Sequence, residues 1–158
     1  MKSKRLKYRE LSKKDISRLF EIYSNAEAMK YRESPVMITI DDANEMLIRD
    51  EEVKKKNYEF RFGIELLTNS ELIGTVMYQP LSDKAIIGYS IDEKYWNNGF
   101  ATEVVAFIVN YLKEKKFRQI DAWVKKENKA SIKVLEKNNF SVISQTLFPN
   151  SVYCVLYL

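Results

Sequence analysis

The sequence predicts a mixed α/β (α+β) fold, and three observations support this class. The chain has 158 residues, of which 46% are hydrophobic and 30% charged, which is the balance of one globular domain. Apolar residues recur with helical spacing over residues 16–26, 43–53 and 101–115. Between these regions, residues 58–91 alternate apolar and polar side chains in runs separated by turn residues, as antiparallel strands do. We therefore expect residues 1–158 to form a single domain.

Helix starts are marked by side chains that can cap exposed N–H groups. Ser12 and Asp15 form one capping box and Thr39 and Asp42 another, because an oxygen on each side chain can accept from an otherwise unpaired backbone N–H. An apolar stripe of helical period follows each box. The expected helices cover residues 16–26, 43–53, 101–115 and 129–138.

Strands are expected where short runs alternate in polarity or are rich in β-branched and aromatic side chains. With the helices they give the order βααβββαβαββ, and no repeat or glycine-rich linker marks a second domain. The expected strands cover residues 6–11, 58–67, 72–79, 85–91, 119–124, 140–145 and 152–157.

Composition excludes several classes of protein. The sequence has no histidine, so Ser-His-Asp catalysis and histidine-ligated metal sites are excluded, and we expect no metal cofactor. Cys154 is the single cysteine, which fits a cytoplasmic location, and no apolar run is long enough for a membrane partner to be expected. The formal net charge of +4 comes from interspersed acidic and basic residues, so a nucleic-acid partner is not expected.

A polar loop before the third expected helix is a candidate anion site. Gly99 lies where this helix begins, and the first N–H groups of a helix have no partner within it. Together with the helix dipole these donors can hold phosphate oxygens, and a glycine lets the backbone approach them closely. A plain turn with a glycine in a permissive conformation explains the loop equally well.

Two asparagines flank the next expected helix. Asn128 can cap its first turn, and Asn139 stands where helices commonly end in a left-handed residue. Both have a structural explanation, so a functional role for Asn128 would come in addition to capping.

Three segments of the chain, in order and spacing, are similar to the GNAT superfamily of acetyl-CoA-dependent N-acetyltransferases. They read GYSID at residues 88–92, YWNNGFATE at 95–103, and ENKAS at 127–131 continuing to EKNNF at 136–140. Within the superfamily the chain resembles most the ribosomal-protein alanine N-acetyltransferase branch. The resemblance covers residues 5–147 and is strongest over residues 88–140.

The resemblance implies a single GNAT-type domain with a central mixed, mostly antiparallel sheet, splayed in the middle and flanked by about four helices. Acetyl-CoA, as cosubstrate, would enter between the strand ending at Ile91 and the strand ending at Val124. Backbone groups would bind its pantetheine and pyrophosphate, and the side chains of Asn128 and Ser131 would contact the other side of the cofactor. The implied cofactor-binding residues are Tyr89, Ser90, Ile91, Trp96, Asn97, Asn98, Gly99, Phe100, Ala101, Thr102, Asn128 and Ser131.

The sequence departs from the family pattern at three positions. Trp96 replaces the usual Gln or Arg, and Asn98 stands where a basic residue is common. Leu135 occupies the position of a tyrosine that protonates the leaving thiolate in many relatives. Ser131, one helical turn earlier, is the candidate substitute.

The expected reaction is direct attack of a neutral amine on the thioester of acetyl-CoA within a ternary complex. Amines are mostly protonated near pH 7, so a base must remove a proton. Glu65, Asp92 and Glu93 are candidate bases, and we take Glu65 as catalytic together with Ser131.

The acceptor is left open by the sequence. A peptide or protein N-terminus is favoured by the resemblance, while a polyamine, an amino acid or an antibiotic is the alternative. Two rival functions are a non-catalytic module that binds acetyl-CoA and a basic RNA-binding domain. As a partner, a second copy of the chain in a homodimer is left open. The residues that could line the acceptor side are Tyr8, Tyr31, Arg32, Tyr78 and Phe148.

Overall fold

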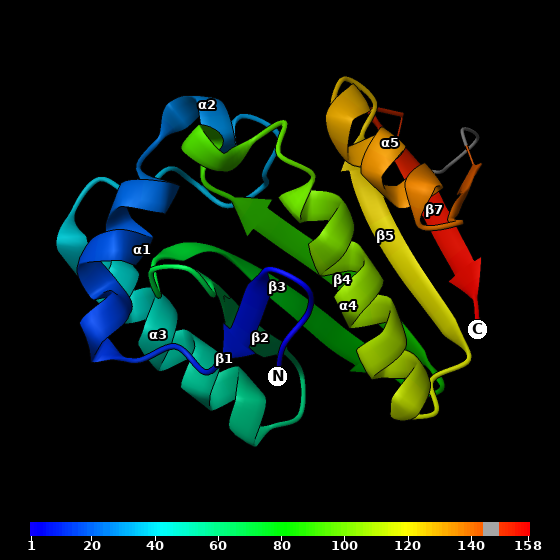
Figure 1. Ribbon diagram of the computed structural model, residues 1–158, viewed down its shortest axis with the longest axis horizontal. Helices are drawn as coiled ribbons and strands as arrows, with labels where there is room; N and C mark the ends of the chain where they lie inside the picture. The colour runs from blue at the N-terminus through cyan, green and yellow to red at the C-terminus, as the bar shows by residue number, and fades with distance from the viewer. Residues whose placement is uncertain (144–148) are drawn as a thin grey trace.

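The computed structural model describes residues 1–143 and 149–158, and its centre is one mixed sheet (Figure 1). Within these residues the sheet has seven strands in the order β1-β2-β3-β4-β5-β7-β6. All neighbouring pairs are antiparallel except β4 and β5, which run parallel. This confirms the mixed, mostly antiparallel sheet. The strands are β1 (Leu6–Arg9), β2 (Phe60–Leu66), β3 (Leu72–Leu81), β4 (Lys84–Ile91), β5 (Gln119–Lys125), β6 (Ser141–Ile143) and β7 (Ser151–Tyr157).

Helices cover both faces of the central strands. On one face, α4 and α5 share the main core with strands β1 to β5 and β7. On the other, α1, α2 and α3 form a smaller core with the start of β3. Figure 1 shows α4 lying across the sheet with α5 beside it, and α1 and α3 on the opposite side of the picture from α5. The helices are α1 (Ile16–Tyr23), α2 (Ala26–Met29), α3 (Ile40–Lys55), α4 (Phe100–Glu114) and α5 (Lys129–Lys137), with 3-10 turns η1 (Lys13–Asp15) and η2 (Glu93–Tyr95).

Both predicted capping boxes form. The Asp15 carboxylate accepts from the Ser12 N–H at 2.8 Å and closes the turn that leads into α1. The Asp42 carboxylate accepts from the Thr39 N–H at 2.9 Å at the start of α3. Local sequence therefore sets the entry to each helix, as expected.

The helix expected over residues 16–26 is divided in the structure. It ends at Tyr23, and the short α2 begins after Asn25, whose side chain accepts from the backbone N–H of Glu27 and of Ala28. The described residues therefore contain five α-helices where about four were expected. The strand expected over residues 140–145 is β6, which ends at Ile143, and position 145 lies outside the described residues.

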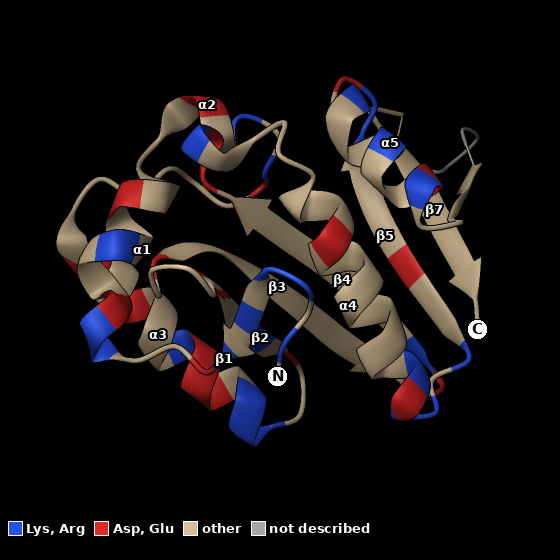
Figure 2. Cartoon of the chain, in the orientation of Figure 1, with Lys and Arg blue, Asp and Glu red and all other residues tan. Residues whose placement is uncertain are grey.

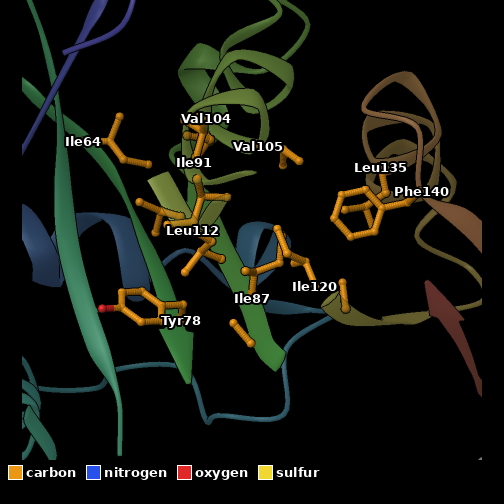
Figure 3. Packing of buried hydrophobic residues seen from close by; sticks show 14 of the residues in the cluster. Ile64, Tyr78, Ile87, Ile91, Val104, Val105, Leu112, Ile120, Leu135 and Phe140 are labelled. Carbon is orange, nitrogen blue, oxygen red and sulfur yellow. The ribbon is translucent and has the colours of Figure 1, made fainter. Parts of the chain in front are cut away.

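The main core lies between the sheet and α4. Figure 3 shows Ile87 and Ile91 of β4 near Val104 and Leu112 of α4. The alternation predicted for β2 is confirmed, because its apolar residues all join this core: Phe60, Phe62, Ile64 and Leu66.

Charged side chains lie mostly on the outer helices and the loops, while the central strands and α4 carry few (Figure 2). Arg61 of β2 is an exception, with only 9% of its side chain exposed. It pairs with Asp50 of α3 at 2.9 Å and with Glu59 at 2.7 Å. The pair with Asp50 links α3 to β2 on the face opposite α4.

Candidate active site

The strands β4 and β5 are paired only where they begin. Their parallel ladder covers three residue pairs, from Lys84–Gln119 to Ile86–Asp121. Beyond this ladder β4 continues to Ile91 paired with β3 alone, and β5 continues paired with β7 alone. Figure 1 shows the two strands close at one end and parted at the other. This confirms the splayed sheet, and we call the facing, unpaired edges of the two strands beyond the ladder the β4–β5 opening.

Backbone groups of β4 alternate between β3 and the β4–β5 opening. The N–H of Asp92 donates to the Ile73 carbonyl at 2.8 Å, so these two residues form a hydrogen-bonded pair. In an antiparallel ladder every second pair is hydrogen-bonded, so the next such pair is Ser90 with Thr75. By this alternation the backbone of Ser90 faces β3, and that of Tyr89 and of Ile91 faces the opening.

Side-chain donors that reach these two carbonyls support the assignment. The Ile91 carbonyl accepts from the Trp96 indole N–H at 2.8 Å, and the Tyr89 carbonyl accepts from Arg32 Nη1 at 3.4 Å. The backbone edge expected to meet pantetheine is therefore directed into the opening at Tyr89 and Ile91, whereas Ser90 contributes no backbone group to it.

The loop before α4 reaches the parted end of β4 and β5. Gly99 is the N-cap residue of α4 and is left-handed, with φ of 75°. Asn97 is also left-handed, with φ of 61°, and the Asn98 side chain donates to the Trp96 carbonyl at 2.8 Å. The first-turn N–H groups of α4, from Phe100 to Thr102, have no acceptor one turn earlier within the helix. The structure thus brings the predicted phosphate loop to the opening (Figure 1).

On the other side of the opening, Asn128 and Ser131 stand at the start of α5. The Asn128 side chain accepts from the Ser131 N–H at 3.1 Å, which confirms the predicted cap. Asn139 is left-handed, with φ of 64°, also as predicted.

The Ser131 hydroxyl lies 2.8 Å from the Tyr89 hydroxyl. This contact joins β4 to α5 across the β4–β5 opening. Burial raises the pKa of Tyr89 to about 12, so the phenol keeps its proton at neutral pH. Sequence reasoning assigned only backbone groups to Tyr89 and missed this hydroxyl, because the partner is distant in the chain. Leu135 is fully buried in the main core beside Phe140 (Figure 3).

Glu65 lies on β2, which β3 separates from β4. Its carboxylate pairs with Arg9 at 2.5 Å and with Lys7 at 3.1 Å. Burial raises the pKa of Glu65, but the hydrogen bonds from Arg9 and Lys7 outweigh burial and hold it below its ordinary value. The structure does not bring Glu65 to the Tyr89–Ser131 pair, and its role as a base stays a prediction.

The other two candidate bases lie just after β4. The Asp92 carboxylate is buried and pairs with Arg18. The Glu93 carboxylate accepts from the Asn25 side chain at 2.7 Å. Both line an open pocket of about 460 Å³ beside α1.

Asp121 is an acidic residue that sequence reasoning missed. It is the last residue of β5 that pairs with β4, so it stands where the two strands part. Its Oδ1 accepts from the Tyr153 hydroxyl and from Gln119 Nε2, each at 2.7 Å. Burial and the bond to Asp121 raise the pKa of Tyr153 to about 12. An alternating strand pattern shows that Asp121 and Ile120 face opposite sides, but not that the sheet opens at this position.

The residues expected to line the acceptor side are dispersed. Tyr8 and Tyr78 are buried in the main core, 1% and 3% exposed, so they line no open surface. The Lys30 ammonium lies 5.0 Å from the centre of the Tyr31 ring. Residue 148, a phenylalanine, lies outside the described residues.

Of these residues, Arg32 contacts the part of β4 that borders the β4–β5 opening. Besides its long contact with the Tyr89 carbonyl, its guanidinium lies 5.3 Å from the Tyr23 ring centre. In the described part of the chain, Arg32 Nε is the single buried side-chain nitrogen or oxygen without a hydrogen-bond partner. No carboxylate of the described residues pairs with this cation.

Residues 1–143 and 149–158 contain neither a candidate membrane-spanning helix nor a candidate metal site. No helix among them has the length and apolar character needed to span a bilayer. Nor do three His, Cys, Asp or Glu residues gather there in a way that could hold a metal ion.

Comparison with known proteins identifies the family. The model of the acetyltransferase (GNAT) domain matches residues 5–141. The uncharacterized N-acetyltransferase YoaA of Bacillus subtilis (strain 168) is 32% identical over 157 residues, covering 95% of this chain and 89% of that protein.

Solved structures agree on the fold. RimL, a ribosomal L7/L12 α-N-protein acetyltransferase in complex with coenzyme A, has a TM-score of 0.82 at 16% identity, covering 99% of this chain and 96% of that one. Spermidine N-acetyltransferase from Vibrio cholerae, in complex with CoA and spermine, has a TM-score of 0.77 at 19% identity, covering 98% of this chain and 95% of that one. With its splayed sheet, its glycine-capped α4 and these matches, the chain belongs to the GNAT family of N-acetyltransferases.

Proposed function

We propose that this protein transfers an acetyl group from acetyl-CoA to the free amine of a peptide or protein N-terminus. The observation that carries the proposal is the β4–β5 opening with the N-terminus of α4 at its parted end. The alternative acceptor is a small amine such as a polyamine, an amino acid or an antibiotic.

The residues around the opening fit acetyl-CoA, which supplies an acetyl group activated as a thioester when bound. The backbone of Tyr89 and Ile91 can pair with the amides of pantetheine, as a neighbouring strand would. The loop from Trp96 to Thr102 offers first-turn N–H donors and a helix N-terminus to the pyrophosphate. Asn128 and Ser131 at the start of α5 bound the other side.

The Tyr89–Ser131 hydroxyl pair is the proposed partner of the leaving sulfur. A phenol whose pKa is about 12 is a weaker acid than a thiol, whose pKa is about 8.5. Complete proton transfer to the thiolate is therefore uphill, and the pair stabilises the sulfur by donating a hydrogen bond. In this proposal the Ser131 hydroxyl donates to the sulfur while its oxygen accepts from the Tyr89 hydroxyl, 2.8 Å away.

Asp121 is the proton acceptor we propose for the amine, through water. It stands where β4 and β5 part, and its side chain lies on the sheet face opposite α4, since the neighbouring Ile120 and Ala122 belong to the main core. Because α4 and α5 would hold the cofactor on their own face of the sheet, the opposite face is left for the amine acceptor. Replacing Asp121 by Asn should lower kcat about a hundredfold.

Arg32 favours a peptide over a polyamine. A guanidinium without a carboxylate partner repels a second ammonium group, and it lowers the pKa of an amine held beside it. Its N–H donors suit the carbonyl oxygens of a peptide backbone. Arg32 lies against the β4 edge at Tyr89, on the same side of the sheet as α1 and α2.

An acceptor screen tests the proposal. Release of free thiol from acetyl-CoA would be followed with a short peptide bearing a free N-terminus, the same peptide with a blocked N-terminus, spermidine and free amino acids. We expect release with the free peptide alone, and a loss of that preference in Arg32→Glu. Faster release with spermidine would overturn the peptide assignment, and release with none of the amines would overturn the transfer itself.

A further inference from the structure

Arg5, one residue before β1, contacts the phosphate loop from behind. Its Nη1 donates to the Asn98 carbonyl at 2.9 Å, and its guanidinium lies 4.2 Å from the Phe100 ring centre. Its Nη2 is 3.7 Å from the point where a Cβ on Gly99 would lie. These contacts fall on three consecutive residues of the loop, which are more than ninety positions away in the sequence.

The bond to Asn98 fixes the direction of the next N–H. The Asn98 carbonyl and the Gly99 N–H belong to one trans peptide plane and point in opposite directions. Since Arg5 holds the carbonyl on the β1 side, the Gly99 N–H points away from β1. In the sheet, β4 and β5 lie beyond β2 and β3 as seen from β1. Arg5 therefore fixes the direction of one backbone donor at the start of α4.

Arg5 also pairs with the acid in the first turn of α4. Its Nε donates to Glu103 Oε2 at 2.7 Å and its backbone N–H to Oε1 at 2.7 Å, while the Ser3 hydroxyl donates to the same Oε1 at 2.7 Å. Burial raises the pKa of Glu103, but these hydrogen bonds outweigh it, so the carboxylate stays charged. Figure 2 shows an acidic band on the otherwise uncharged start of α4. Without Arg5, this charge would oppose an anion at the helix N-terminus.

We propose that Arg5 is a positioning residue for the pyrophosphate of coenzyme A, an inference that rests on the proposed function. It supplies from outside the loop the positive charge that Asn98 does not, and it orients the Asn98–Gly99 peptide so that its N–H faces the phosphate. Lysine cannot replace it, because one ammonium cannot bond Asn98 and Glu103 while covering the Phe100 ring.

The experiment compares binding of CoA with binding of pantetheine, which lacks the pyrophosphate and the adenosine. Calorimetry would measure both ligands with the wild type, Arg5→Gln, Arg5→Lys and Glu103→Gln. The matched control is Lys4→Gln, which removes an equal charge from the adjacent, exposed residue. Thermal unfolding would verify each fold, and the Arg5 side chain is 42% exposed, so its removal leaves no sealed cavity.

Both Arg5 variants should bind CoA about ten- to thirtyfold more weakly, the cost of one charge-assisted contact, with pantetheine binding unchanged. Glu103→Gln and Lys4→Gln should bind CoA within about threefold of the wild type. Equal CoA binding by Arg5→Gln would overturn the proposal, as would equal losses for CoA and pantetheine or a loss in Glu103→Gln as large as in Arg5→Gln. Failure of the wild type to bind CoA would instead overturn the proposed function.

Discussion

The hydroxyl groups of Tyr89 and Ser131 lie 2.8 Å apart, one on β4 and the other in the first turn of α5. Since β4 and β5 are no longer paired at this level, the contact is a side-chain link between the two halves of the sheet. Leu135, for which the family resemblance suggests a tyrosine position, has its side chain in the core. In the proposed reaction, stabilisation of the leaving group therefore depends on a pair of residues from different elements.

Removing either hydroxyl should slow transfer more than it weakens binding. Ser131→Ala and Tyr89→Phe should each lower kcat about ten- to a thousandfold, with CoA affinity changed by less than about threefold. Because the two groups share one hydrogen bond, the double variant should lose less than the sum of the single losses. Steady-state rates at saturating substrates and CoA titrations check this. A loss confined to CoA affinity would make Ser131 a cofactor contact only.

Gly99→Val should abolish CoA binding in a protein that still folds. The residue is left-handed, which costs a β-branched side chain about 1–2 kcal/mol, and the added atoms would crowd Arg5 Nη2, which lies 3.7 Å from the position of a Cβ. Gly99→Asn is the matched variant, since asparagine tolerates this conformation, as Asn97 and Asn139 do. Both should lose CoA binding by calorimetry. Full affinity in Gly99→Asn would show that backbone conformation, and not occupied space, is what matters.

Cys154 should be dispensable for transfer. The thiol is fully buried in the main core, and burial raises its pKa to about 11, so it is protonated and inaccessible at neutral pH. Cys154→Ala should lose about 1–2 kcal/mol of folding stability and keep its turnover. Mass spectrometry of enzyme mixed with acetyl-CoA alone is the companion measurement. An acetyl group on this sulfur, or turnover lost in a folded variant, would contradict direct transfer.

Glu65 and Asp15 should make the free energy of unfolding depend on pH in the acidic range. Burial raises the pKa of both carboxyls, but the hydrogen bonds from Arg9, joined by one from Lys7 on Glu65, outweigh it and leave both pKa values lowered. A lowered pKa in the folded state stabilises the fold above the ordinary carboxyl pKa of about 4, and this contribution is lost as pH falls through the folded value. Arg9→Gln should therefore cost about 2 kcal/mol at pH 7 and much less near pH 3 in urea titrations. Equal costs at both pH values would contradict this.

Much of the site follows from local sequence. Gly99, Asn128 and Asn139 each take the conformation or cap that their residue type favours, and each could be placed before any tertiary contact was known. The same holds for the start of α3 at the Thr39–Asp42 box.

Other features depend on contacts that no local pattern contains. Arg5 reaches Asn98 across a sequence separation of 93 residues, and Tyr89 reaches Ser131 across 42. The pairing that ends at Asp121 decides where the sheet opens, and an alternating strand pattern looks the same whether a neighbour is present or not. The role of a side chain at the opening is therefore visible only in the folded chain.

Initial-rate kinetics distinguish transfer within a ternary complex from transfer through an acyl-enzyme. Thiol release would be measured while acetyl-CoA and a peptide with a free N-terminus are varied together. Direct attack predicts double-reciprocal lines that intersect, because both substrates must be bound before thiol is released. Parallel lines, the signature of an acyl-enzyme, or thiol release that does not depend on the peptide would contradict the account.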